Sequence, residues 1–356
     1  MQIKVALRFH PFSHRPGTCC LLPGSFWQIT AFPTLLEFKN LYTGMSFEVH
    51  LGIQGPVREL TLEQDLERGE LRFFGHSQKG YFRLRISRQE KGMQLLIEKT
   101  PEGGLIYQID GNETRAEEKA ARLIPLPLEH PLVPPPETRL SLGVHKAQDW
   151  DLVLRRGELA EILPFWMRLA DWLPKMREEL RSAGSLRLLT DCEVAERQEM
   201  ISALCKAFLV GFHDLLVPQL KDPLHQGILK EEKIPEGLSP LYFLKRGGEI
   251  LRSLFLQEEN EKILLLPRLP PEFSSGRFTH LRLDNGDLLD LEWSKKLLRR
   301  VVIHPNATRE VAFALQKPLR TFRVRLSEKD RGRRIHCDEM LRLLEGERVF
   351  LDRFEK

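Results

Sequence analysis

A proline-rich stretch, "PLPLEHPLVPPPE" at residues 125–137, divides this chain into parts with different local patterns. Each proline ring fixes its own backbone φ angle and removes an N–H donor, so the stretch cannot form a helix interior or a central strand. It predicts a stiff connector, which we place at residues 126–154. Because 356 residues exceed the size of most single hydrophobic cores, we expect two or more domains around this connector.

Before the connector, residues 1–125 contain short runs of alternating, β-branched and aromatic residues separated by glycine-containing turns. In "YFRLRIS", Phe82, Leu84 and Ile86 fall on one face of an extended chain, and Arg83 falls on the other. This alternation is typical of a sheet with one buried side. Residues 1–125 therefore predict an antiparallel β-sandwich.

After the connector, residues 155–262 show helical periodicity. In "GELAEILPFWMRLADWLPKMREELRSAG", apolar residues recur at intervals of three and four, and Trp166 lies on the apolar stripe. Two further segments, beginning at Cys192 and Ser239, share this periodicity. We expect a short α-helical region with Trp166 in its core.

The remaining sequence returns to strand patterns. Residues 263–326 include Asn285-Gly286 between runs of alternating leucines, which predicts a tight hairpin because both residues tolerate positive φ. Residues 327–356 form a charged tail, with a short helix expected around "DEMLRLLEG" and ending at Gly346. The predicted fold is α+β: an N-terminal antiparallel β-sandwich, a short α-helical middle region and a C-terminal antiparallel β domain.

The segment "ILLLPRLPPEFSSGRFTHLRLDNGDLLDLEW" at residues 263–293 resembles the barrel end and following β domain of bacterial α-L-fucosidases of glycoside hydrolase family 95. In that family, a helix similar to "RGGEILRSLFLQ" leads into an "LLPALP"-like segment, a glycine-containing hairpin and an acidic-apolar strand ending in tryptophan. The resemblance covers residues 239–326, about a quarter of the chain. The matching residues are Leu265, Leu266, Pro267, Leu269, Pro270, Gly286, Leu291, Glu292 and Trp293.

The sequence departs from that family at the catalytic position. The family carries a "QIDGN"-type stretch before the helix, with a catalytic aspartate, whereas residues 240–244 read "PLYFL". The string "QIDGN" at residues 108–112 lies in the N-terminal β region, where an Asp-Gly turn is expected. The family's barrel needs about twelve helices, and residues 155–256 can supply about four to six. The resemblance therefore implies the order sandwich, helices, sandwich and a link to sugars, without an assignable pair of catalytic carboxylates.

The segment "GVHKAQDWDLVLRRGE" at residues 143–158 is the densest cluster of functional side chains. His145, Gln148 and Asp149 could hydrogen-bond sugar hydroxyls, and Trp150 could stack on a sugar face. Alternatively, Asp149 could cap the following helix and Trp150 could anchor the connector. We favour these structural roles, which need no ligand.

The opening stretch "RFHPFSHRPGTCC" gathers His10, His14, Cys19 and Cys20. Adjacent cysteines point to opposite faces of an extended chain, and structural zinc motifs space paired cysteines by two to four residues. We therefore predict a structural loop and no metal site. The five cysteines are scattered, so free thiols are expected.

Composition and motifs limit which cofactors and binding partners are expected. No phosphate-binding loop, dinucleotide fingerprint or serine-hydrolase elbow occurs, so no cofactor is predicted. Residues 295–334 hold thirteen lysines and arginines against three acidic residues, while the chain carries +4 overall. Arg323 and Arg325 could thus contact an acidic protein or nucleic acid, or could be outward residues of a strand. Without an apolar run of about 20 residues or a conventional signal peptide, a soluble cytoplasmic protein with no integral membrane segment is expected.

Three functions remain open from the sequence. The first is a glycoside-hydrolase-like protein that has lost catalysis and acts in carbohydrate binding or as a scaffold. The second is an active glycosidase with relocated carboxylates. The third is an adaptor for protein or nucleic acid that uses the basic C-terminal region.

Overall fold

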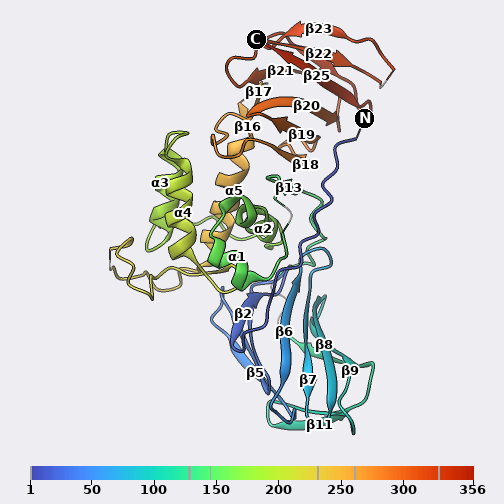
Figure 1. Ribbon diagram of the computed structural model, residues 1–356, viewed down its shortest axis with the longest axis vertical. Coiled ribbons are helices and arrows are strands. Elements are labelled where there is room, and N and C mark those ends of the chain that lie inside the picture. The colour runs from blue at the N-terminus through green and yellow to red at the C-terminus, as the bar shows by residue number, and fades with distance from the viewer. Residues whose placement is uncertain (1, 127–129, 145, 231, 260–261, 328) are drawn as a thin grey trace.

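The computed structural model describes residues 2–356 except 127–129, 145, 231, 260–261 and 328. The described chain has a β-rich region at each end and a helical layer between them (Figure 1). This arrangement confirms the predicted α+β class.

The N-terminal region is a sandwich of two six-stranded antiparallel sheets. Sheet A has the order β1-β6-β7-β8-β9-β12, and sheet B has the order β11-β10-β5-β4-β3-β2. The strands of sheet A are β1 (Phe12–Ser13), β6 (Arg58–Asp65), β7 (Glu70–Ser77), β8 (Gly80–Gln89), β9 (Gly92–Lys99) and β12 (Ala120–Pro125). The strands of sheet B are β2 (Thr18–Leu21), β3 (Trp27–Phe32), β4 (Leu35–Asn40), β5 (Ser46–Leu51), β10 (Leu105–Ile109) and β11 (Asn112–Ala116).

Alternation along the strands builds the sandwich core as predicted. In β8, Phe82, Leu84 and Ile86 are at most 1% exposed. The intervening Arg83 and Arg85 lie on the outer face, where both pair with Glu98. Burial of one face drives the pairing, because apolar surface removed from water stabilises the sheet.

The helical layer follows the connector. Its helices are α1 (Trp150–Arg156), α2 (Leu159–Asp171), α3 (Leu186–Val194), α4 (Met200–Gly211) and α5 (Leu241–Phe255). Helix α2 packs on α5, where Trp166 is fully buried and stacks on Phe243 at 5.6 Å. This contact confirms the predicted core role of Trp166. None of the helices in the described residues is long and apolar enough to cross a membrane.

Polar contacts fix α2 onto the sandwich. The Arg168 side chain is 1% exposed and donates hydrogen bonds to the backbone oxygens of Leu66 and Thr138. Trp172 donates its indole N–H to the same Leu66 oxygen at 2.8 Å. Glu67 lies 3.3 Å from the Arg168 guanidinium and balances its charge. The turn after β6, which contains Leu66 and Glu67, therefore attaches the helical layer to the sandwich.

The C-terminal region contains a seven-stranded sheet of order β13-β18-β19-β20-β25-β22-β23 and a four-stranded sheet of order β16-β17-β21-β24. The seven-stranded sheet comprises β13 (Arg139–Ser141), β18 (Gly276–Arg282), β19 (Leu288–Ser294), β20 (Leu297–His304), β22 (Thr321–Arg325), β23 (Arg333–His336) and β25 (Val349–Glu355). The four-stranded sheet comprises β16 (Leu256–Glu259), β17 (Lys262–Leu265), β21 (Arg309–Leu315) and β24 (Leu341–Leu343). Pairing is antiparallel except between β17 and β21.

The hairpin predicted at Asn285-Gly286 is confirmed. It joins β18 to β19, and Gly286 has a φ of 90°. The backbone N–H of Leu283 donates to the Asp287 oxygen at 2.8 Å, which closes the turn. The flanking leucines and Trp293 are buried on one side, as their alternation predicted.

The helix predicted around residues 338–346 is wrong. Leu341 and Leu343 are buried in β24, which pairs with β21, and the residue between them is exposed. This period-two burial can be satisfied only by a strand. Beyond it, β25 lies between β20 and β22, so the charged tail supplies a central strand of the C-terminal sheet.

The helical pattern beginning at Cys192 is also interrupted. Helix α4 ends at Gly211, and a two-stranded hairpin of β14 (Phe212–His213) and β15 (Val217–Pro218) follows. A Cβ at Gly211 would lie 2.0 Å from the Phe243 ring, so only glycine allows α5 to approach this closely. The hairpin brings His213 and Asp214 against the sandwich, a placement that local periodicity does not predict.

The first residues of the chain run alongside all three regions (Figure 1). Ile3 packs with Val302 and Phe350 of the C-terminal sheet. Further along, the Leu7 oxygen accepts a hydrogen bond from Arg139 at 3.2 Å. The segment then enters sheet A at β1, so it links the two β-rich regions.

Candidate functional site

The sequence cluster at residues 143–158 lies at the start of α1. Asp149 caps this helix, because its carboxylate accepts hydrogen bonds from the backbone N–H groups of Asp151 and Leu152. The Gln148 side chain accepts from the His10 N–H at 2.6 Å and donates to the Arg8 oxygen. His145 lies outside the described residues.

Trp150 is the aromatic residue of that cluster. It is 1% exposed, and its ring meets Phe165 of α2 edge to face at 5.4 Å. Together with Gln148 and Asp149, Trp150 joins α1 to the N-terminal segment and to α2. The polar groups of Gln148 and Asp149 hydrogen-bond to the protein itself, and the Trp150 ring is packed in the core, where its indole N–H has no hydrogen-bond partner among the described residues. None of the three side chains therefore presents a polar group on an open surface.

The histidines and cysteines of the opening stretch do not meet one another. His10 faces Glu63 at 3.4 Å, and His14 lies 2.9 Å from the Thr61 hydroxyl. Cys19 and Cys20 are buried in β2, and burial raises the pKa of both thiols. The predicted free-thiol state agrees with the structure, in which all five cysteines are unpaired.

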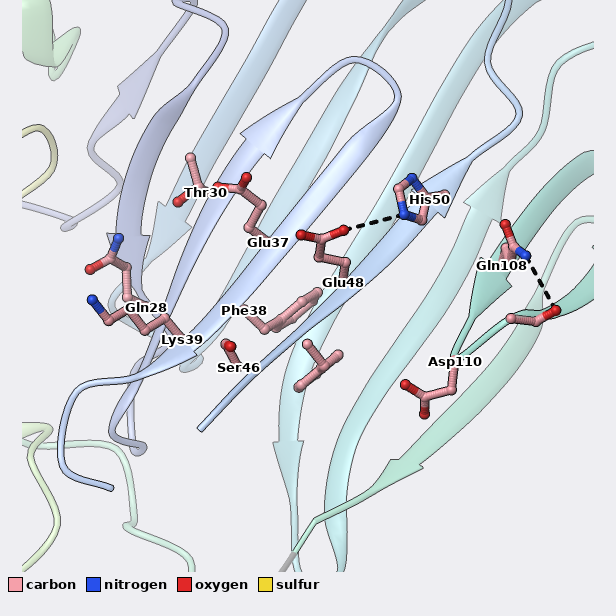
Figure 2. A pocket seen from close by; sticks show the side chains of 12 residues that line it. Gln28, Thr30, Glu37, Phe38, Lys39, Ser46, Glu48, His50, Gln108 and Asp110 are labelled. Atoms are coloured by element: carbon pink, nitrogen blue, oxygen red, sulfur yellow. Dashed lines mark hydrogen bonds and ion pairs between the residues drawn. The ribbon is translucent and has the colours of Figure 1, made fainter. Parts of the chain in front are cut away.

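A hollow of about 600 Å³ lies on the outer face of sheet B (Figure 2). Three neighbouring strands, β3, β4 and β5, form most of its surface, and the hairpin between β10 and β11 closes one side. The polar residues that line it are Gln28, Thr30, Glu37, Lys39, Ser46, Glu48, His50, Gln108 and Asp110.

The alternation of each strand places these side chains outward. In β4, Leu36 and Phe38 are buried, whereas Glu37 and Lys39 reach solvent. Phe38 stacks on Phe47 of β5 with ring centroids 4.5 Å apart, which fixes the two strands from the inner side. The hollow is therefore a polar surface on a rigid apolar base.

Strand register determines which polar groups are neighbours. Glu37 of β4 is directly paired with Thr30 of β3 and with Glu48 of β5. Further along, His50 is paired with Gln108 of β10. Two carboxylates thus sit side by side on one face, an arrangement that normally destabilises a sheet because like charges repel.

The hairpin between β10 and β11 forms the far side of the hollow. Asp110 and Gly111 both have positive φ, at 50° and 79°, as the Asp-Gly turn predicted from "QIDGN" requires. The Gln108 side chain donates to the Gly111 oxygen at 3.2 Å and holds the turn in place (Figure 2). Asp110 remains exposed at its tip.

Most polar groups in the hollow are not used by the protein. Glu48 pairs with His50 at 3.3 Å. Among the described residues, the side chains of Gln28, Thr30, Glu37 and Lys39 make no hydrogen bond or ion pair. Their donors and acceptors are available to a ligand that enters the hollow.

A carboxyl with a shifted pKa lies elsewhere, at the end of α2. Asp171 reaches solvent, yet the surrounding protein reduces its hydration and raises its pKa to about 6, against the opposing effects of Arg252 and Arg168. A carboxyl that titrates near neutrality could act as a general acid. Glycoside hydrolysis also needs a second carboxyl across the scissile bond, and the charged groups acting on Asp171 are arginines.

The two arginines proposed as contacts for an acidic partner share one carboxylate. Arg323 binds Asp352 through two hydrogen bonds of 2.7 and 2.9 Å, and Arg325 binds it at 2.8 Å. The Arg325 side chain is 9% exposed and lies over the Phe350 ring. The Asp352 carboxylate thus neutralises part of the positive charge of Arg323 and Arg325, which the sequence alone suggested could bind a partner.

Comparison with known proteins gives no identification: neither a protein-family model nor a curated protein sequence matches this chain. The function must therefore be inferred from the site itself.

Sequence reasoning did not single out the hollow. Its sequence signals are the Asp-Gly turn of "QIDGN" and the polar half of ordinary strand alternation in "FWQITAF" and "MSFEVHLGI". The pairing of Glu37 with Glu48 depends on register across a turn, which the alternation of either strand alone does not fix.

Proposed function

We propose that this chain is a glycoside-hydrolase-like protein that binds carbohydrate without hydrolysing it, and that the hollow on sheet B is the binding site. The observation that carries the proposal is a hollow of about 600 Å³ lined by polar side chains with unused hydrogen-bonding groups. This volume falls in the range of small-molecule sites, about 300–1,000 Å³. The resemblance of residues 239–326 to family 95 fucosidases supports the same ligand class.

The side-chain chemistry favours a hydroxyl-rich ligand. Carboxylates accept two hydrogen bonds side by side, and amides both donate and accept, so together they match the alternating donors and acceptors of sugar hydroxyls. Hydroxyl donors placed between Glu37 and Glu48 would relieve the repulsion of these two carboxylates.

The charge of the lining favours a neutral sugar. Glu37, Glu48 and Asp110 contribute three carboxylates, and Lys39 contributes the one permanent positive charge. A uronic acid or sulfated sugar would meet a surface of its own sign. We therefore expect neutral glycans to bind in preference to acidic ones.

The same surface is poorly suited to hydrolysis. A general acid must hold its proton near neutral pH, which requires burial or an apolar pocket. Glu48 is exposed and lies 3.3 Å from His50, so it lacks the buried or apolar surroundings that a general acid needs. Binding without turnover is thus the function that this geometry supports best, and an active glycosidase is the alternative.

An array of neutral and acidic glycans tests the proposal. Wild-type protein should bind neutral glycans, and E37Q combined with Q108A should lose at least about tenfold in affinity, or about 1.4 kcal/mol. The matched control is E90Q, which changes an exposed glutamate at the turn between β8 and β9 of the other sheet. Binding of acidic glycans alone, or equal binding by E37Q/Q108A and wild type, would contradict the assignment.

The adaptor alternative has weaker support. Its proposed contacts, Arg323 and Arg325, already bind Asp352. A phosphate or carboxylate of a partner would have to compete with that carboxylate. We therefore do not place the function at this pair.

A further inference from the structure

Three side chains of types that can ligate a metal meet where the sandwich contacts the helical layer. Cys19 belongs to β2, the edge strand of sheet B, and His213 and Asp214 belong to the hairpin after α4. One potential ligand atom from each residue lies within 4.8 Å of the other two. The residues are almost two hundred positions apart in sequence, so tertiary structure alone creates this group.

Backbone contacts hold the two sides together. Cys20 forms a parallel bridge with Leu215, and the Leu215 N–H donates to the Cys19 oxygen at 3.2 Å. The hairpin thus continues the edge of sheet B beyond β2. Backbone contacts, the buried side chains of Leu215 and Leu216 and the pairing of Asp214 with Arg15 together set the relative positions of Cys19 and Asp214.

The polar atoms within the group are incompletely satisfied. The Cys19 thiol donates to the Asp214 carboxylate at 3.2 Å. Nδ1 of His213 is buried and has no hydrogen-bond partner among the described residues. The Val217 backbone makes only a weak hydrogen bond with the His213 ring, so a ligand on a ring nitrogen would stabilise the structure.

We propose that Cys19, His213 and Asp214 bind a divalent transition-metal ion of the zinc class. Sulfur, imidazole nitrogen and carboxylate oxygen are the donor types that zinc takes. Around a tetrahedral zinc these atoms would be about 3.4–3.6 Å apart, so small side-chain movements bring the group into position. Three protein ligands leave a fourth position for water.

Binding has a defined proton balance. The thiol of Cys19 loses its proton to solvent as the metal–sulfur bond forms. The Asp214 oxygen that accepted the thiol hydrogen bond then binds the metal. The guanidinium of Arg15 pairs with the other oxygen of Asp214 and orients the carboxylate. The Asp214 side chain is 17% exposed, which gives the ion a route from solvent.

The metal would act as a clamp between the sandwich and the helical layer. It joins the edge of sheet B to the hairpin that follows α4, and would add to the backbone bridge between Cys20 and Leu215 and to the core packing of Leu215. Ligands that bind only the folded state raise stability by mass action. This inference is independent of the sugar site, which lies on the outer face of the same sheet.

Cobalt titration of the full-length, reduced and chelator-treated protein tests the site. We expect one Co²⁺ per chain, with a thiolate-to-cobalt charge-transfer band and a rise in Tm. C19S and H213N should each weaken binding by more than the roughly 10–100-fold that loss of an outer partner costs. Circular dichroism shows whether each variant folds. If C19S does not fold, Co²⁺ binding by H213N alone tests the site.

The matched control is C337S, which removes the thiol of the surface group His336, Cys337 and Asp338. C337S should bind Co²⁺ as wild type does. Absence of a thiolate band in wild type at excess Co²⁺, persistence of the band in H213N, or its loss in C337S would each overturn the assignment.

Discussion

Glu37 and Glu48 are direct cross-strand partners on the outer face of sheet B, so two carboxylates face solvent at one point of the hollow. Neighbouring carboxylates repel each other, and the fold retains both on a rigid base formed by Phe38 and Phe47. We interpret this pair as a cost to stability that a hydroxyl-rich ligand relieves.

Removing one charge should stabilise the free protein. In E37Q the repulsion with Glu48 is lost, so the free energy of unfolding should rise by about 0.2–1 kcal/mol in urea unfolding without ligand. The gain should shrink in high salt, which screens exposed charges. E90Q should change stability less; an E37Q protein less stable than wild type would contradict the repulsion.

The contact between α2 and α5 should be intolerant of added volume. A Cβ at Gly247 would lie 2.2 Å from the Trp166 ring, so G247A should lower the free energy of unfolding by about 1–3 kcal/mol. The control is E249A in the same helix, where the side chain is exposed. Equal stability of G247A and wild type in thermal unfolding would show that the helices can separate without cost.

His10 should make stability depend on pH. Its hydrogen bond with Glu63 raises the pKa of His10 above 6.5, with Asp65 adding to the effect and burial and Arg72 opposing it. Because the folded state binds this proton more tightly, the stabilisation is complete below pH 6.5 and is lost as pH rises through the folded-state pKa.

Urea unfolding of wild type and H10Q across this pH window tests that sign. The free energy of unfolding should be higher for wild type than for H10Q at low pH, and this difference should decrease as pH rises above 6.5. A difference in the free energy of unfolding that grows with pH would mean that the folded state favours the neutral imidazole.

Asp352 should be essential for the C-terminal sheet. D352N would remove the carboxylate that Arg323 and the buried Arg325 share, so the free energy of unfolding should fall by about 3–5 kcal/mol. The control D338N breaks the exposed pair with Lys262 and should cost no more than about 1 kcal/mol. Similar losses in the two variants would show that Asp352 contributes no more to stability than an exposed ion pair does.

Strand alternation and turn chemistry predicted much of the fold. The hairpin at Asn285-Gly286, the inward face of β8 and the core position of Trp166 all follow from local rules that the structure obeys. The predicted helix at residues 338–346 failed because the burial of Leu341 and Leu343 depends on β21, a distant partner. Local helical spacing cannot report such a pairing.

The candidate sites were less predictable for the same reason. Glu37 meets Glu48 through strand register, and Cys19 meets His213 through packing of a hairpin against an edge strand. In contrast, Gln148, Asp149 and Trp150 are close in sequence but are used in capping and packing. A cluster of functional residue types in the sequence thus does not predict where the fold gathers polar groups that are free to bind a ligand.

Hydrogen–deuterium exchange with and without a neutral glycan selected on the array tests the central claim most directly. A sugar in the hollow should slow exchange in peptides covering β4, β5 and the turn at Asp110-Gly111, and should leave the turn between β8 and β9 unchanged. Protection confined to α1, to the Asp171 region or to the C-terminal sheet would contradict a binding site on sheet B.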